Sequence, residues 1–154
     1  MADLDSVLYH DVRGLELIHE YETDLVELEG NQILTGNDLY MAVRRRIILT
    51  GRARRYQDNV EPWIAPLPPN VIVRAKSCVA IFQYFIPAAM LEHSPGELRE
   101  GMYDLTNLTK PTEDIIFRKM GIDDALTTTK VEVKTVSKDD KFRLRLMAYI
   151  YGEK

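Results

Sequence analysis

Few side chains in this sequence are of the types that catalyse reactions or bind metals. The three histidines, His10, His19 and His93, do not pair at metal-ligand spacing, and His19-Glu20 is not part of a His-Glu-x-x-His helix. The sequence contains no Gly-x-Ser-x-Gly elbow, no phosphate loop and no Gly-rich dinucleotide turn. Carboxylates crowd residues 16–29, but nothing singles out a general acid and a general base. We therefore predict that the chain is not an enzyme and has no catalytic residue, cofactor or metal.

The single cysteine, Cys78, excludes an internal disulfide framework and suits a reducing compartment. Its neighbours along the chain, residues 79–82, are all apolar. A thiol in such surroundings behaves as a small hydrophobic group. We therefore predict a buried structural thiol rather than a nucleophile.

Charge is distributed unevenly along the chain, whose net charge is -4. Residues 1–30 contain nine acids and one base, Arg13, whereas residues 44–55 contain no acid and half of all the arginine. The six members of this arginine cluster are Arg44, Arg45, Arg46, Arg52, Arg54 and Arg55. Such asymmetry indicates that these surfaces meet opposite charge, either in each other or in a partner.

Three interpretations of the arginine cluster remain open. Arg52, Arg54 and Arg55 can make bidentate contacts with carboxylates of a neighbouring subunit or with phosphates. Alternatively, they form a solvated face with some internal ion pairing. Binding to nucleic acid would require a wider basic field and exposed aromatic residues, whereas the pI is near 5.4 and the cluster is one local patch. The sequence therefore favours a protein partner or a solvated face, and we expect no nucleic acid.

Length and composition predict one soluble domain over residues 1–154. Hydrophobic residues make up 45% and charged residues 29% of the chain, as in ordinary globular proteins. No stretch approaches the roughly 20 apolar residues of a membrane helix. The chain starts Met-Ala-Asp-Leu-Asp, which is acidic and not followed by an apolar segment, so we expect no signal peptide and no membrane partner.

The strongest structural signal is the alternation of apolar and polar residues across 129–151. Val131 and Val133 alternate with charged residues, and a second alternating run covers residues 142–151. Residues 137–140, Ser-Lys-Asp-Asp, form a polar turn between the two runs. This pattern predicts a C-terminal β-hairpin, whose apolar face needs a cover from the rest of the chain.

The preceding segments predict helices and short strands. We expect residues 1–22 to be a loosely structured acidic segment with a short helix near 15–21, followed by a strand at 23–29 that returns at 33–35. Asn37 caps a helix that runs to residue 49 or 50 and is ended by Gly51. Residues 56–69 contain four prolines and read as a connection, in which Trp63 docks on the body or on a partner.

Apolar residues from 71 to 86 recur at helical spacing and predict a buried helix that ends before Pro87, although a strand over 79–86 is an alternative. A turn follows at 94–96, then a short helix or packed loop over 97–109. Pro111 suits the first position of a helix that ends at Gly121. The predicted fold class is α+β, with a small antiparallel or mixed sheet and a C-terminal β-hairpin packed against two to four helices.

Two segments resemble the baseplate wedge and sheath-initiator family of contractile phage tails, which is sometimes labelled lysozyme-like. They are IILTGRARR at 47–55, and the helix that leads into VEV at 131–133 and SKDDKFRLRL at 137–146. The resemblance covers about residues 35–56 and 111–151. The chain is similar to the family in two respects. One is a helix that ends in a Thr- and Arg-containing turn, and the other is a closing helix followed by a strand pair with an acidic turn. Residues 57–110 are longer than in compact members, which implies a family-specific insertion.

The resemblance implies a non-enzymatic virion protein of the tail baseplate, assembled in the host cytoplasm and present in six copies in a ring around the tail tube. Its implied partners are the baseplate wedge proteins and the tail sheath protein, to which it would offer a sheet edge, and the tail tube is a further candidate partner. Such an edge accepts a strand of another chain through backbone hydrogen bonds. The side chains expected to match an acidic sheath arm are Lys130, Lys134, Arg143 and Arg145.

Two other functions fit the sequence. One is a different tail or neck assembly module, such as a tail-completion protein, which differs only in its partner. The other is a cell-wall hydrolase, which the family's old label suggests and which would require a cleft with paired carboxylates.

Overall fold

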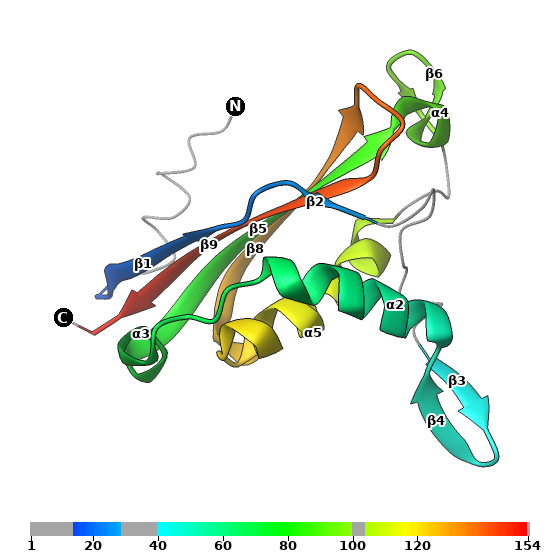
Figure 1. The fold of residues 1–154 in the computed structure, drawn as a ribbon. Coiled ribbons are helices and arrows are strands. Elements are labelled where there is room, and N and C mark those ends of the chain that lie inside the picture. Colours follow the sequence, from blue (N-terminus) through cyan, green and yellow to red (C-terminus); the bar gives the residue numbers. More distant parts are fainter. Residues whose placement is uncertain (1–13, 29–39, 100–103, 154) are drawn as a thin grey trace.

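The protein has an α+β fold, in which helices cover one face of a mixed five-stranded sheet (Figure 1). The computed structural model describes residues 14–28, 40–99 and 104–153. The strand order is β1-β9-β5-β8, and β2 lies beside β9 in line with β1. The sheet consists of β1 (Glu16–Glu22), β2 (Val26–Glu27), β5 (Ala75–Pro87), β8 (Thr127–Ser137) and β9 (Arg143–Gly152).

Two long helices and several short elements complete the fold. The helices are α2 (Gly51–Val60), α3 (Pro69–Arg74), α4 (Ala88–Leu91) and α5 (Leu105–Met120), with 3₁₀ turns η2 (Glu61–Trp63) and η3 (Asp124–Leu126). Two small hairpins are β3 (Tyr40–Val43) with β4 (Arg46–Leu49), and β6 (Glu92–Ser94) with β7 (Glu97–Leu98). The predicted fold class is therefore confirmed. No helix in the described part of the chain is long and apolar enough to cross a membrane.

The two C-terminal strands form where the alternation predicted them, but they do not pair with each other. β5 lies between them, parallel to β8 and antiparallel to β9. The prediction of a hairpin was wrong in this respect, because alternation reveals strands and not their neighbours. The connection from Ser137 to Arg143 must pass over the end of β5, and it spans two inter-strand spacings, or about 10 Å.

The predicted helix over 71–86 is mostly a strand. Only α3 is helical there, and β5 begins at Ala75, so the alternative of a strand over 79–86 is the correct one. Residues 77–82 are all buried because β5 is the middle of the sheet. A strand buried on both faces has a continuous apolar sequence, which periodicity cannot distinguish from a buried helix. Residues 57–110 thus supply the central strand of the sheet.

The predicted helix that ends near residue 50 is also wrong over its described part. Residues 40–49 form the β3–β4 hairpin, whose turn residues Arg44 and Arg45 have φ values of 47° and 65°. Thr50 then caps the next helix, since its hydroxyl accepts a hydrogen bond from the Ala53 N–H at 3.0 Å. Gly51 therefore begins α2 instead of ending a helix.

The remaining predictions had mixed outcomes. Residues 16–22 form β1 and not a helix, and the strand predicted at 23–29 is reduced to β2. Helix α2 extends to Val60, into the expected connection, and residues 97–109 contain β7 and the start of α5. Pro111 lies inside α5, which Asp104 caps, and is not a first helical residue. The turn at 94–96 and the end of the helix at Gly121 are confirmed. Residues 33–35 and Asn37 lie outside the described residues.

The core lies between the sheet and the helices α2 and α5. Buried side chains on alternate positions of β5 and β9 meet those of the two helices. They include Phe82, Tyr84, Ile86, Leu144, Leu146, Val60, Leu108, Ile116 and Met120. The hydroxyls of Tyr56 and Tyr84 are buried here and bond to the α5 threonines Thr112 and Thr109, at 2.7 and 3.0 Å. These bonds satisfy the buried hydroxyls and fix α5 beneath the sheet.

Candidate interaction surfaces

The outer edge of β8 is the longest unpaired strand edge in the described part of the chain. β8 has 11 residues and pairs only with β5 there. Successive residues of a strand direct their backbone N–H and C=O groups to opposite sides. About half of the backbone groups of β8 therefore point away from the sheet, where a strand of another chain can bond to them.

The side chains of β8 are mixed, with exposed valines among charged residues. Val133 and Val136 are 38% and 37% exposed. The ε-amino group of Lys130 contacts Glu113 of α5 at 3.2 Å and Glu132 at 3.5 Å. Burial lowers the pKa of Lys130, but the hydrogen bonds and charges of Glu113 and Glu132 outweigh it, so the pKa is raised. Lys130 is thus held against α5 instead of reaching outward.

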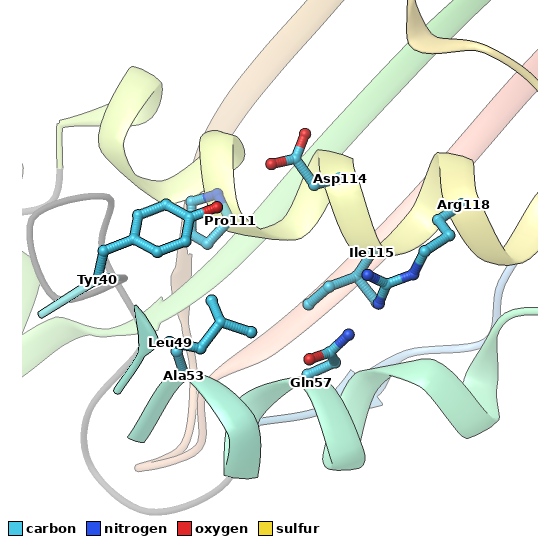
Figure 2. A pocket seen from close by; sticks show the side chains of 8 residues that line it. All are labelled: Tyr40, Leu49, Ala53, Gln57, Pro111, Asp114, Ile115 and Arg118. Atoms are coloured by element: carbon cyan, nitrogen blue, oxygen red, sulfur yellow. The ribbon is translucent and has the colours of Figure 1, made fainter. Parts of the chain in front are cut away.

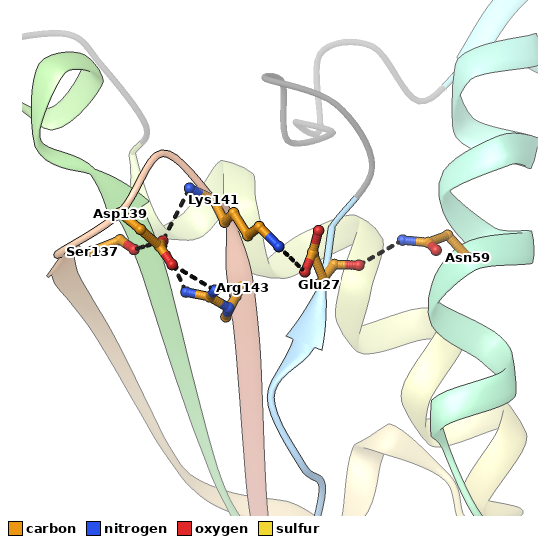
Figure 3. Close-up of polar contacts among 6 residues, drawn as sticks. All are labelled: Glu27, Asn59, Ser137, Asp139, Lys141 and Arg143. Carbon is orange, nitrogen blue, oxygen red and sulfur yellow. Dashed lines mark hydrogen bonds and ion pairs between the residues drawn. The ribbon is translucent and has the colours of Figure 1, made fainter.

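A polar network fixes the turn after β8 (Figure 3). Asp139 accepts hydrogen bonds from Ser137 at 2.8 Å and from the guanidinium of Arg143 at 2.7 and 2.9 Å. Lys141 bonds to the Glu27 carboxylate at 3.1 Å, and the Asn59 amide of α2 donates to the Glu27 carbonyl at 3.0 Å. This network joins the end of β8 to β9, β2 and α2, and so sets the position of one end of the free edge.

The predicted basic contacts on the C-terminal strands are mostly used within the chain. Arg143 is paired with Asp139, Arg145 with Glu22 of β1, and Lys130 with Glu113. Both arginines lie on β9, which is an inner strand. Of the four predicted residues, Lys134 alone has no ion pair within the described residues. The structure therefore does not gather these four side chains into one outward-facing basic site.

The arginine cluster is divided between two elements at one end of the molecule. Arg44, Arg45 and Arg46 lie at the tip of the β3–β4 hairpin, and Arg52, Arg54 and Arg55 lie in the first two turns of α2. The first turn of α2 contains no acid. Because a helix N-terminus carries partial positive charge, arginines here add to a positive field instead of offsetting a negative one. The six arginines thus lie on two consecutive elements, a hairpin and a helix, and not along the single helix that the sequence predicted.

A pocket of about 260 Å³ lies between α2, α5 and the base of the β3–β4 hairpin (Figure 2). Its lining residues are Tyr40, Leu49, Ala53, Gln57, Pro111, Asp114, Ile115 and Arg118. Most of these side chains are apolar, and one acid and one base lie on α5. A pocket with this lining can accept an apolar side chain of a partner.

Sequence reasoning missed the pocket and misplaced the free edge. The pocket depends on residues from 40 to 118 that only the tertiary fold brings together. The free edge belongs to β8 because β5 occupies its other side, and a continuous apolar run from Cys78 to Phe82 was the one available signal for a central strand.

No protein-family model matches this chain, and no curated protein matches it.

Proposed function

We propose that this protein is a structural assembly component that binds its partner by strand addition at the outer edge of β8. On the resemblance of its C-terminal third, the assembly is the baseplate of a contractile phage tail, and the partner that adds a strand is the tail sheath protein. The observation that carries this proposal is that, among the described strands, β5 alone pairs with the 11-residue strand β8, so no described strand lies along its outer edge.

Rigidity of the edge supports this proposal. β8 is held by β5 along its length, by the Lys130–Glu113 contact to α5, and by the network around Asp139 at its end. A preorganised edge loses little conformational freedom on binding, so backbone hydrogen bonds to an added strand contribute more to affinity. Val133 and Val136 supply apolar contacts that select the register of the added strand.

Cys78 does not present a nucleophile at the described surface. Cys78 is fully buried, and burial, with a smaller effect of Glu113, raises the pKa of its thiol to about 12. The described part of the chain holds no cluster of histidine, cysteine and carboxylate side chains suited to a metal. A scaffold with a free strand edge needs neither group for the function that we propose.

Two single proline variants, Val133→Pro and Lys134→Pro, test the edge. Proline removes the backbone N–H group of the residue it replaces. The N–H groups of two successive strand residues point to opposite sides. One variant therefore loses a hydrogen bond to β5, and the other loses only a donor on the outer edge. Thermal unfolding identifies the variant that keeps the stability of the native chain. We expect this stable variant to load onto baseplates and to lower the assembly of purified sheath protein on them.

Sheath assembly at the native rate with the stable variant would contradict the proposal. Val136→Pro tests a further position of the same strand. The control is Asp140→Asn, because Asp140 is exposed and lies beyond the strand.

A further inference from the structure

The β3–β4 hairpin, which we call the arm (residues 40–49), projects from the body at the start of α2 (Figure 1). Every residue of β3 is exposed, and so are Arg46 and Ile47 of β4. Ile47 is 77% exposed, Tyr40 55%, Met41 45% and Val43 37%. A lone two-stranded hairpin is marginally stable in water, and clustered exposed apolar side chains mark binding surfaces. The arm therefore has the properties of an element that is completed by a partner.

The charge of the arm defines the chemistry of that partner. Arg44, Arg45 and Arg46 occupy its tip, and Arg54 and Arg55 are exposed on the adjoining helix. The sequence has no acid between residues 40 and 57 that would neutralise them. A surface that binds the arm must therefore combine apolar side chains with negative charge.

The opposite edge of the sheet, formed by β1 and the residues after it, has this combination. Leu17 and Leu25 are 43% and 46% exposed. Glu20 and Asp24 are exposed next to them and have no ion pair within the described residues, unlike Glu16, Glu22 and Glu27. In the described sheet β1 pairs only with β9, so it also presents an unpaired strand edge. We call residues 16–25 the acidic edge.

The arm projects away from the acidic edge of its own chain, from the end of α2 that is farther from β2 (Figure 1). We propose that the arm of one copy docks on the acidic edge of a second copy. Its arginines face Glu20 and Asp24, its apolar side chains face Leu17 and Leu25, and a strand of the arm continues the sheet beyond β1. Because two different surfaces meet, the contact is heterologous and repeats from copy to copy into a ring or a filament. This contact leaves β8 free and does not depend on the function proposed for it.

Sedimentation velocity of the purified chain at low salt tests the association. We expect species larger than the 17.8 kDa monomer, whose fraction rises with concentration and falls with salt. Ile47→Asp should weaken association by about tenfold or more, because it places a charge in the apolar contact. Leu98→Asp is the matched control, since Leu98 is 54% exposed on the other small hairpin, and it should associate as the native chain does.

Mixing two defective variants distinguishes this contact from a symmetric one. Ile47→Asp lacks a working arm, and the double variant Glu20→Lys with Asp24→Lys lacks a working acidic edge, so each alone should stay monomeric. Their mixture retains one intact arm and one intact edge, and it should form dimers of one copy of each and nothing larger.

Circular dichroism should show that all variants keep the fold, because the substituted side chains are exposed. A native chain that stays monomeric at high concentration would overturn the proposal. So would a mixture that stays monomeric, or association that Ile47→Asp leaves unchanged. Loss of association in the arm variant alone, with the acidic-edge variant unaffected, would indicate arm-to-arm pairing and would equally overturn it.

Discussion

At the scale of single residues, the turn after β8 depends on one carboxylate. Asp139 accepts four hydrogen bonds, from Ser137, from the Lys141 backbone and twice from Arg143. The Arg143 guanidinium, with Ser137 and the Lys141 amide, holds the pKa of Asp139 well below its ordinary value of 3.8. A carboxylate bound so firmly fixes the path by which the chain crosses over β5 from β8 to β9.

We expect Asp139→Asn to lower the free energy of unfolding at neutral pH and to leave it nearly unchanged in strong acid. Because folding lowers the pKa of Asp139, its stabilisation is present above pH 3.8 and is lost as the pH falls below that value. Urea unfolding at several pH values measures the effect. Asp140→Asn is the control at the adjacent exposed carboxylate, and an equal loss in both variants would show that the network has no special role.

The Cys78 thiol should not react in the folded protein. It is fully buried on β5, and burial raises its pKa to about 12, so the nucleophilic thiolate is nearly absent at pH 8. We expect no reaction with a disulfide reagent at pH 8 and one equivalent of reaction in guanidinium chloride. Fast reaction of the folded chain would show that β5 opens readily.

The raised pKa of Cys78 also predicts that the free energy of unfolding falls as the pH rises above the ordinary thiol pKa of 9.

At the scale of elements, helix α2 begins with a charge pattern that does not favour it. Three arginines follow Gly51 and no acid lies in the first turn, so the Thr50 cap is the local feature that satisfies a free N–H group there. We expect Thr50→Ala to lower the free energy of unfolding by about 1 kcal/mol, and Thr50→Ser to retain most of it. Chemical denaturation measures both variants, and equal stability of all three proteins would contradict the assignment of this cap.

The elements also show how far the sequence determines the fold. Alternation located β8 and β9 to within a few residues. β9 has one buried and one half-buried face over most of its length, whereas Ser137 is the one buried residue of β8. The same reasoning failed at β5, whose two buried faces remove the alternation, and so it could not place β5 between the other two.

The arm was missed for a different reason. Arg44 and Arg45 adopt positive φ, which the Asn-Gly type of turn sequence normally signals, so the turn carries none of its usual sequence marks. The candidate surfaces were predictable only in part. The arginine cluster is visible in the sequence, whereas the free edge and the pocket exist only once distant segments have packed together.

At the scale of the whole molecule, the described residues form a sheet whose two outer strands, β1 and β8, each pair with one described strand on one side only, together with an arm. In the account we propose, β8 accepts a strand of the sheath protein, while the arm and the acidic edge join neighbouring copies. The three surfaces lie on different elements, so one copy can use all of them at once (Figure 1). Such a division suits a component that repeats around an axis and also templates a second layer.

Electron cryomicroscopy of the particle that contains this chain would show directly what lies along the outer edge of β8. The account predicts that a strand of a sheath subunit lies along the outer edge of Thr127–Ser137, within backbone hydrogen-bond distance of β8. A chain found in the baseplate with that edge facing solvent would contradict strand addition, and a chain found at the neck of the tail would contradict the baseplate role.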